Sequence, residues 1–195
     1  FSISTATFCT VAAPSVSSNT RLLESHSRSR RIIPGKARLT ISPAAAADSE
    51  AAEEAASAAV DFDRIDYDVI SNFGTHCRER NIERAPLNHG RFIMSSRRGA
   101  SSHVHNPFLI MTSHGADEVS GDAYGFVLVY SGNFTAEIAA NQFDTARAVI
   151  GLNPEAFRWK LESGEEFTTP ECVMTYSSEG LDTLSYNLLK NNLLE

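Results

Sequence analysis

The order of hydrophobic and polar positions predicts β-strands along most of the chain. Residues 126–130 are continuously apolar and rich in strand formers, which is typical of a strand covered on both faces. Residues 134–138 and 157–161 alternate apolar and polar side chains, as half-buried strands do. Turn-forming residues separate these segments, at 34–35, 131–133 and 163–164. Short strands between frequent turns predict a mainly β fold, a twisted antiparallel β-sandwich.

The hydrophobic period changes from two to the helical spacing near the end of the sequence. Leu181, Leu184, Leu188, Leu189 and Leu193 fall on one face of a helix, so the pattern predicts an amphipathic helix over residues 181–195. An apolar helix face needs a surface to pack on, either the sandwich itself or a following domain. We favour the second, so the helix is expected to act as a linker toward a following domain that is absent from the chain.

The predicted organisation has three parts. Residues 1–27 form a poorly defined segment, Ser-rich and nearly acid-free, which is either a targeting segment or the start of a truncated sandwich. Residues 28–180 form the sandwich domain. It contains an Ala/Glu-rich insertion at 43–59, which lacks large apolar side chains and is expected to be solvated.

Charge and cysteine content narrow the classes of function. Residues 1–47 carry six bases and one acid, whereas the rest carries 11 bases and 23 acids. An acidic body argues against nucleic-acid binding, which needs clustered cations. No apolar run approaches the roughly 20 residues of a membrane span. The three cysteines are far apart in sequence and form no metal or disulfide pattern.

Several histidines could carry chemistry. His103 and His105 form an HxH pair that could chelate zinc in a strand, with His89 and His114 nearby in sequence. No third ligand with suitable spacing follows, so structural histidines are the preferred interpretation and no metal is expected.

A dense set of arginines is the second candidate. It could bind an anion or form salt bridges between strands, and the second alternative is preferred. Its members are Arg78, Arg80, Arg84, Arg91, Arg97 and Arg98. Asn133-Phe134-Thr135 matches a glycosylation sequon, although a plain hairpin turn is favoured there. The nucleophile-elbow, phosphate-loop and dinucleotide glycine patterns are missing, so no catalytic residue and no cofactor are predicted.

The order and spacing of many short motifs resemble the N-terminal domain of glycoside hydrolase family 36 α-galactosidases. The resemblance is closest in the second half of the chain and weaker at 28–39, 55–62 and 74–80, which look like earlier strands. The closest motifs lie at residues 95–108, 124–126, 129–134, 142–144, 151–154, 157–161, 164–165 and 169–171.

This resemblance implies a larger enzyme in which a β-sandwich, or supersandwich, precedes a catalytic (β/α)8 barrel. The family hydrolyses α-galactosides with retention, using two aspartates of the barrel. This chain would therefore be inactive alone, with the barrel and an α-galactoside as its partners and a homo-oligomer as the family's usual assembly. The resemblance also nominates His76 as a substrate-binding residue, because the family usually has a tryptophan there that lines the galactose pocket. The alternative is a plain surface histidine, since this chain departs from the family at that position.

Two alternatives differ in class. The chain could be a stand-alone carbohydrate-binding module, although its single Trp159 sits in core register. It could also be an inactive, truncated gene product that does not fold stably.

Overall fold

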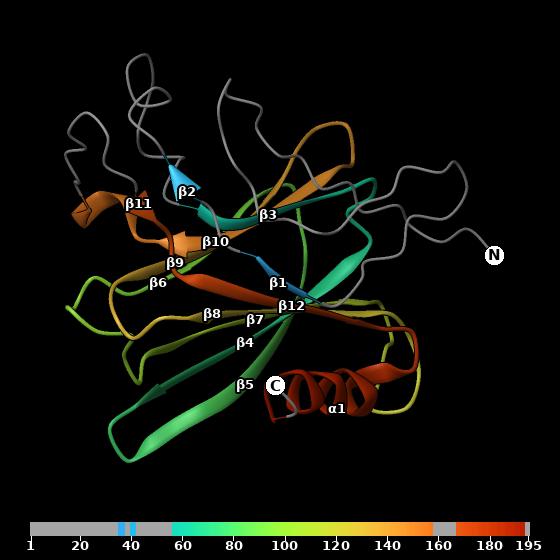
Figure 1. Ribbon diagram of the computed structural model, residues 1–195. Helices are drawn as coiled ribbons and strands as arrows, with labels where there is room; N and C mark the ends of the chain where they lie inside the picture. The colour runs from blue at the N-terminus through green and yellow to red at the C-terminus, as the bar shows by residue number, and fades with distance from the viewer. Residues whose placement is uncertain (1–34, 38–39, 42–55, 158–166, 194–195) are drawn as a thin grey trace.

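The structure is a computed structural model. It describes residues 35–37, 40–41, 56–157 and 167–193. The fold is mainly β, as predicted, and consists of two antiparallel sheets packed face to face (Figure 1). The larger sheet contains, in spatial order, β1 (Gly35–Ala37), β12 (Glu171–Ser177), β8 (Ala123–Val129), β7 (His105–Ser113), β4 (Tyr67–Thr75) and β5 (Arg78–Pro86).

The smaller sheet contains β3 (Ala56–Phe62), β10 (Ala146–Leu152), β9 (Phe134–Ala140) and β6 (Gly90–Ser95) in that order. A short pair joins β2 (Thr40–Ile41) to β11 (Phe167–Thr168), and a single 3-10 turn spans Pro154–Ala156. The predicted strand at 157–161 lies largely outside the described residues.

The core lies between the two sheets and follows the strand period of two. In β9 every second side chain, at Phe134, Ala136 and Ile138, is fully buried, which confirms the predicted alternation. The predicted two-sided strand is β8, whose Phe126 faces this core between neighbouring strands. At one end of the core, the rings of Phe62, Tyr67 and Tyr124 meet edge to face, with centroids 5.2 to 5.9 Å apart.

Helix α1 (Gly180–Leu193) lies on the outer face of the larger sheet, opposite the smaller sheet (Figure 1). Leu184 is 1% exposed and packs against Ile70 and Ile110 of that face. The first amides of the helix are also satisfied by the β7–β8 connection. The N–H of Leu181 donates to the Asp117 carbonyl at 3.0 Å, and the next amide donates to the Glu118 carbonyl at 2.9 Å.

These contacts show one surface on which the predicted helix packs. Leu184 and the first amides of the helix have partners on the sandwich, whereas Leu189 of the same helix is exposed, and the expected following domain stays a prediction. Among the described residues, no helix is both long enough and apolar enough to cross a membrane.

Strand β3 begins before the predicted end of the Ala/Glu-rich insertion at residue 59. Residues 56–59, which the composition placed in the insertion, begin this strand instead. They pair antiparallel with β10, with Ala59 opposite Val149 and Ala58 opposite Ile150. Alanine has a low strand propensity, so composition did not indicate a strand here. The backbone hydrogen bonds to β10 hold these residues in the strand. Residues 1–27, 43–55 and 194–195 lie outside the described residues.

Candidate functional site

The β4–β5 hairpin carries the residue nominated from the sequence. Thr75 ends β4 and Arg78 begins β5, so His76 and Cys77 form the turn between them. Both turn side chains are exposed, and Figure 1 shows the hairpin extending beyond its neighbours at one end of the larger sheet. Residues 74–80, which resembled one strand in the sequence, are therefore a hairpin tip.

Hydrogen bonds and close backbone packing hold the hairpin tip in place. The N–H of Gly74 donates to the Val104 carbonyl at 3.0 Å, which ties the tip to the β6–β7 connection. A Cβ atom at Gly74 would lie 2.7 Å from the Arg78 carbonyl oxygen, so only glycine fits there. The side-chain amide of Asn81 donates to the Phe73 and Arg78 carbonyls, at 3.2 and 3.1 Å. The tip is thus held in one geometry although its own side chains are solvated.

Two further connections meet at the same end of the sandwich. The β6–β7 connection joins the β8–β9 turn through the N–H of Ser101, which donates to the Ser131 carbonyl at 2.7 Å. The N–H of Gly99 donates to Oδ1 of Asn133 at 2.7 Å. Asn133 therefore ties the β6–β7 connection to the turn after β8. This turn leads from the larger sheet to the smaller one, so the hairpin favoured from the sequence at this position is wrong. Buried Asn153 completes the support, because its amide donates to the Ser96 carbonyl at 3.2 Å.

The histidine candidates are dispersed rather than gathered. His103 is exposed in the β6–β7 connection. His105 begins β7, and its buried Nδ1 has no hydrogen-bond partner among the described residues. His89 contacts Asp144 at 2.9 Å. Within the described part of the chain, no group of three or more His, Cys, Asp or Glu side chains could hold a metal ion, so the HxH pair finds no third ligand there.

The arginine set is divided between ion pairs and the hairpin tip. Arg91 pairs with Glu137 across strands β6 and β9, at 3.2 Å, and Arg97 pairs with Glu155. Arg78 and Arg80 are exposed beside His76. Arg84 pairs with Asp68, so Arg84, Arg91 and Arg97 each form a salt bridge with a different acid. These three side chains do not converge on one anion site.

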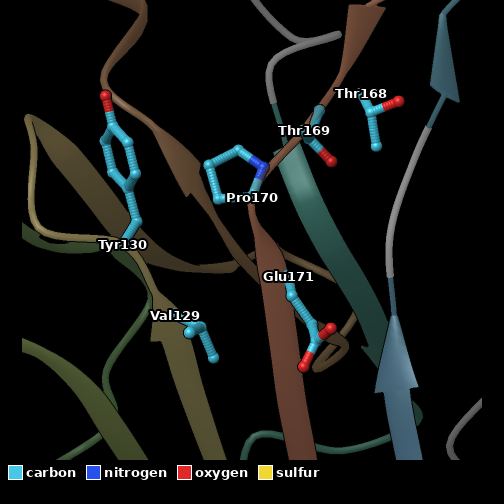
Figure 2. Close-up of a pocket in the computed structure, with 6 residues that line it drawn as sticks. All are labelled: Val129, Tyr130, Thr168, Thr169, Pro170 and Glu171. Atoms are coloured by element: carbon cyan, nitrogen blue, oxygen red, sulfur yellow. The ribbon is translucent and has the colours of Figure 1, made fainter.

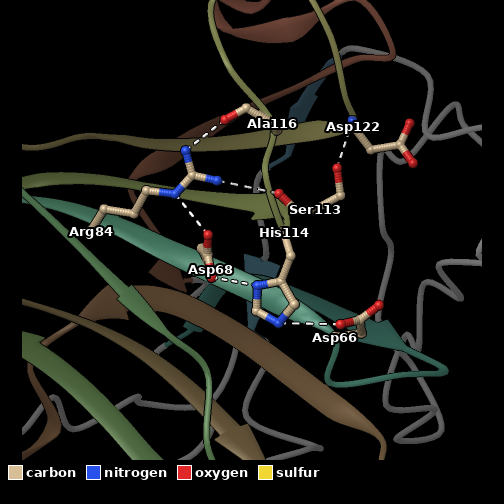
Figure 3. Close-up of polar contacts among 7 residues, drawn as sticks. All are labelled: Asp66, Asp68, Arg84, Ser113, His114, Ala116 and Asp122. Atoms are coloured by element: carbon tan, nitrogen blue, oxygen red, sulfur yellow. Dashed lines mark hydrogen bonds and ion pairs between the residues drawn. The ribbon is translucent and has the colours of Figure 1, made fainter.

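A charged network that sequence reasoning missed lies near the start of β4, about 20 Å along the strand from the tip. Figure 3 shows Asp68 between Arg84 and His114. Its carboxylate accepts from Nε of Arg84 at 2.7 Å and contacts Nδ1 of His114 at 2.5 Å. The other ring nitrogen of His114 lies 3.2 Å from Asp66. Arg84 also donates to the Ala116 carbonyl at 2.6 Å.

This network is structural in character. Burial of Asp68 opposes its ionisation, but the hydrogen bonds from Arg84 and His114 outweigh burial and hold the pKa of Asp68 below its ordinary value. Its charge therefore persists into acidic solution. The network ties β4 and β5 to the β7–β8 connection, which in turn receives helix α1.

Other titratable groups of the described core are unsuited to catalysis. Burial raises the pKa of the Cys172 thiol to about 12, so it stays protonated and is a poor nucleophile at neutral pH. Burial and a 2.8 Å hydrogen bond to Asp122 raise the pKa of Tyr176 to about 12. Neither group supplies a general base at neutral pH.

Comparison with known families and structures agrees with this architecture. Residues 23–162 match the model of the glycosyl hydrolase family 36 N-terminal domain. The bifunctional α-galactosidase/sucrose kinase AgaSK of Mediterraneibacter gnavus is 46% identical over 144 residues, which are 72% of this chain and 15% of the relative. The α-galactosidase AgaA of Geobacillus stearothermophilus is 53% identical over 131 residues, which are 67% of this chain and 18% of the relative.

The crystal structure of AgaA superposes with a TM-score of 0.68 at 47% identity, over 77% of this chain and 19% of that one. The galactosidase domain of AgaSK superposes equally well, with a TM-score of 0.68 at 44% identity and with the same coverage. This chain spans less than a fifth of the relatives that it matches. The sequence match covers more than half of the chain, and the folds agree. The chain belongs to glycosyl hydrolase family 36 and contains that family's N-terminal domain.

Proposed function

We propose that this chain is the non-catalytic N-terminal domain of a retaining α-galactosidase that removes terminal α-galactosyl residues from oligosaccharides. The observation that carries the proposal is the match to AgaA, an α-galactosidase, in both sequence and structure. In this role the sandwich supports a catalytic (β/α)8 barrel, which provides both catalytic carboxylates.

The second part of the proposal concerns His76, which would wall one side of the galactose pocket. Its exposed position at the tip of a braced hairpin supports this role, because a projecting and rigid side chain can reach into a neighbouring domain. An imidazole offers a sugar a smaller face than an indole, together with a polar nitrogen.

The first test measures activity of the chain alone. The purified chain is incubated with a nitrophenyl α-galactoside, beside full-length AgaA as the positive control. We expect no nitrophenol above the buffer rate, because the catalytic carboxylates belong to the barrel. Turnover comparable to that of AgaA would contradict the non-catalytic role.

The second test is a chimera in which this domain replaces the matching segment of AgaA. The chimera is expected to be active. The His76→Trp variant is expected to lower KM about three- to tenfold with little change in kcat, because a larger aromatic face strengthens binding of the sugar.

The matched control is Ile82→Trp, which adds the same ring to the same hairpin, at a site on β5 that is 74% exposed. It should leave KM unchanged. Equal effects of the two substitutions, or no effect of His76→Trp, would remove His76 from the pocket.

A further inference from the structure

An open hollow lies where strand β8 ends beside the start of β12. Six residues line it, and its volume is about 430 Å³. They are Val129, Tyr130, Thr168, Thr169, Pro170 and Glu171 (Figure 2). This volume falls within the range of small-molecule sites, roughly 300 to 1,000 Å³.

The lining combines ring faces with neutral and acidic oxygen atoms. Tyr130 is 40% exposed, Val129 is 56% exposed, and Figure 2 shows Pro170 between Tyr130 and the two threonines. Thr168 adds an exposed hydroxyl. Glu171 adds a carboxylate, whose two oxygens can accept several hydrogen bonds at once. None of the six lining residues is a cation, so the hollow is unsuited to phosphate or another anion.

The backbone holds this lining in place. Val129 and Glu171 are direct partners in the β8–β12 ladder, so their side chains share one face of the sheet. The Tyr130 ring rests on the backbone of Gly132, where a Cβ atom would lie 2.4 Å from the ring. The turn beneath is tied down through the 2.7 Å bond from the Ser101 N–H to the Ser131 carbonyl. The aromatic platform is therefore preorganised.

We propose that this hollow is a binding subsite for a neutral hexopyranoside, separate from the hairpin tip. A pyranose ring has an apolar C–H face that stacks on an aromatic ring and a rim of hydroxyl groups that need hydrogen-bond partners. Tyr130 supplies the platform for the face, and Thr168 and Glu171 supply partners for the rim. A lipid would need a deeper and more apolar hollow than this one.

The test is a titration of the isotope-labelled chain with methyl α-galactoside and methyl α-glucoside, followed by amide chemical shifts in NMR. We expect saturable shifts, with millimolar affinity, at residues 129–131, 168, 169 and 171. Tyr130→Ala should weaken binding about tenfold. Gly132→Ala should weaken it too, because its added methyl group displaces the ring while every lining residue is kept.

Two controls make the result specific. Tyr186→Ala removes an aromatic ring that is 63% exposed on helix α1 and should leave affinity unchanged. The second control is the set of shifts at residues 76–78 of the hairpin tip, which are followed apart from those of the hollow, so that failure of this subsite and failure of the proposed galactose-pocket role are distinguished.

The dispersion of the amide spectrum shows whether each variant is folded. Binding of either sugar, or of both, supports a hexopyranoside subsite when Tyr130→Ala reduces it. The proposal is overturned if neither sugar gives saturable shifts, if the shifts lie elsewhere, or if Tyr130→Ala and Gly132→Ala both bind as wild type does.

Discussion

Gly74 shows how one residue sets the shape of the hairpin tip. Its backbone angles are open to other residues, but its Cα faces the strand that returns from the turn. A Cβ atom would lie 2.7 Å from both the Arg78 carbonyl oxygen and Glu79 Cα, and 3.0 Å from the His103 carbonyl oxygen. These are backbone atoms, which yield far less than the end of a flexible side chain.

Gly74→Ala is therefore expected to destabilise the domain by about 1 to 3 kcal/mol, as overpacking does. Chemical denaturation monitored by circular dichroism measures the loss. Thr75→Ala is the neighbouring control, at an exposed side chain, and should change stability by less than about 0.5 kcal/mol. A Gly74→Ala variant as stable as wild type would show that the tip is loosely held.

Asp68 gives the domain a defined response to acid. Its pKa in the folded state lies below the ordinary value of about 3.9 expected for the unfolded chain. The stabilisation is therefore fully present above that unfolded pKa and is lost as the pH falls through the folded pKa.

Asp68→Asn is expected to lower the free energy of unfolding by about 1 to 3 kcal/mol at pH 7, since it removes charge-assisted hydrogen bonds to Arg84 and His114. The deficit should shrink as the pH falls below about 4. Urea denaturation from pH 7 to pH 2.5 measures both effects. Asp66→Asn, at a 67% exposed side chain, should cost less than about 1 kcal/mol. A deficit that is independent of pH would contradict the role assigned to the Asp68 charge.

At the scale of elements, helix α1 is a third layer on the sandwich. Leu184 is buried on the outer sheet face, while Leu189 of the same helix is 59% exposed. The two leucines therefore provide a matched pair on one element.

Leu184→Ala is expected to destabilise the domain by about 2 to 4 kcal/mol through the cavity it leaves. Leu189→Ala should change stability by less than about 0.5 kcal/mol. Thermal or chemical denaturation of both variants checks the prediction. Similar losses from the two variants would mean that the apolar face of the helix does not pack on the sheet through Leu184.

The sequence predicted those elements whose burial follows a simple period. Strand β9 and helix α1 each have one buried face, so their hydrophobic positions repeat with the spacing of the element. Strand β5 shows no such period because it is an edge strand with few buried side chains, and Arg84 was therefore considered as an anion ligand. Composition placed the first residues of β3 in the insertion because alanine has a low strand propensity, whereas the family resemblance at 55–62 indicated the strand that pairs with β10.

The candidate sites were predicted less completely than the fold. His76 was nominated from the family resemblance rather than from spacing, and its contact with substrate stays a prediction. The network of Asp68, Arg84 and His114 joins residues 16 and 46 positions apart, which no local motif reveals. The hollow at Tyr130 likewise depends on the pairing of β8 with β12.

At the scale of the whole molecule, the layered arrangement predicts an ordered gradient of stability. Strand β8 lies inside the larger sheet, with the smaller sheet on one side and helix α1 on the other. Among the described residues, its amide hydrogens are expected to exchange with solvent far more slowly than those of residues 76–78 at the hairpin tip.

Native-state hydrogen exchange on the isolated chain measures this gradient. Slow amides in β7, β8 and β12 would support a domain that folds by itself. Uniformly rapid exchange would favour the alternative of a truncated gene product that does not fold stably.

The exposed margin formed by β5 has a consequence for how copies of the domain could meet. The strand carries Arg78, Glu79, Arg80, Glu83 and Arg84 within nine residues and ends at Pro86. Alternating charges and a terminal proline discourage another strand from docking along such a margin. Strand β5 is therefore expected not to extend the sheet into a neighbouring copy of the domain, which protects the domain at this margin from the earliest step of fibril growth.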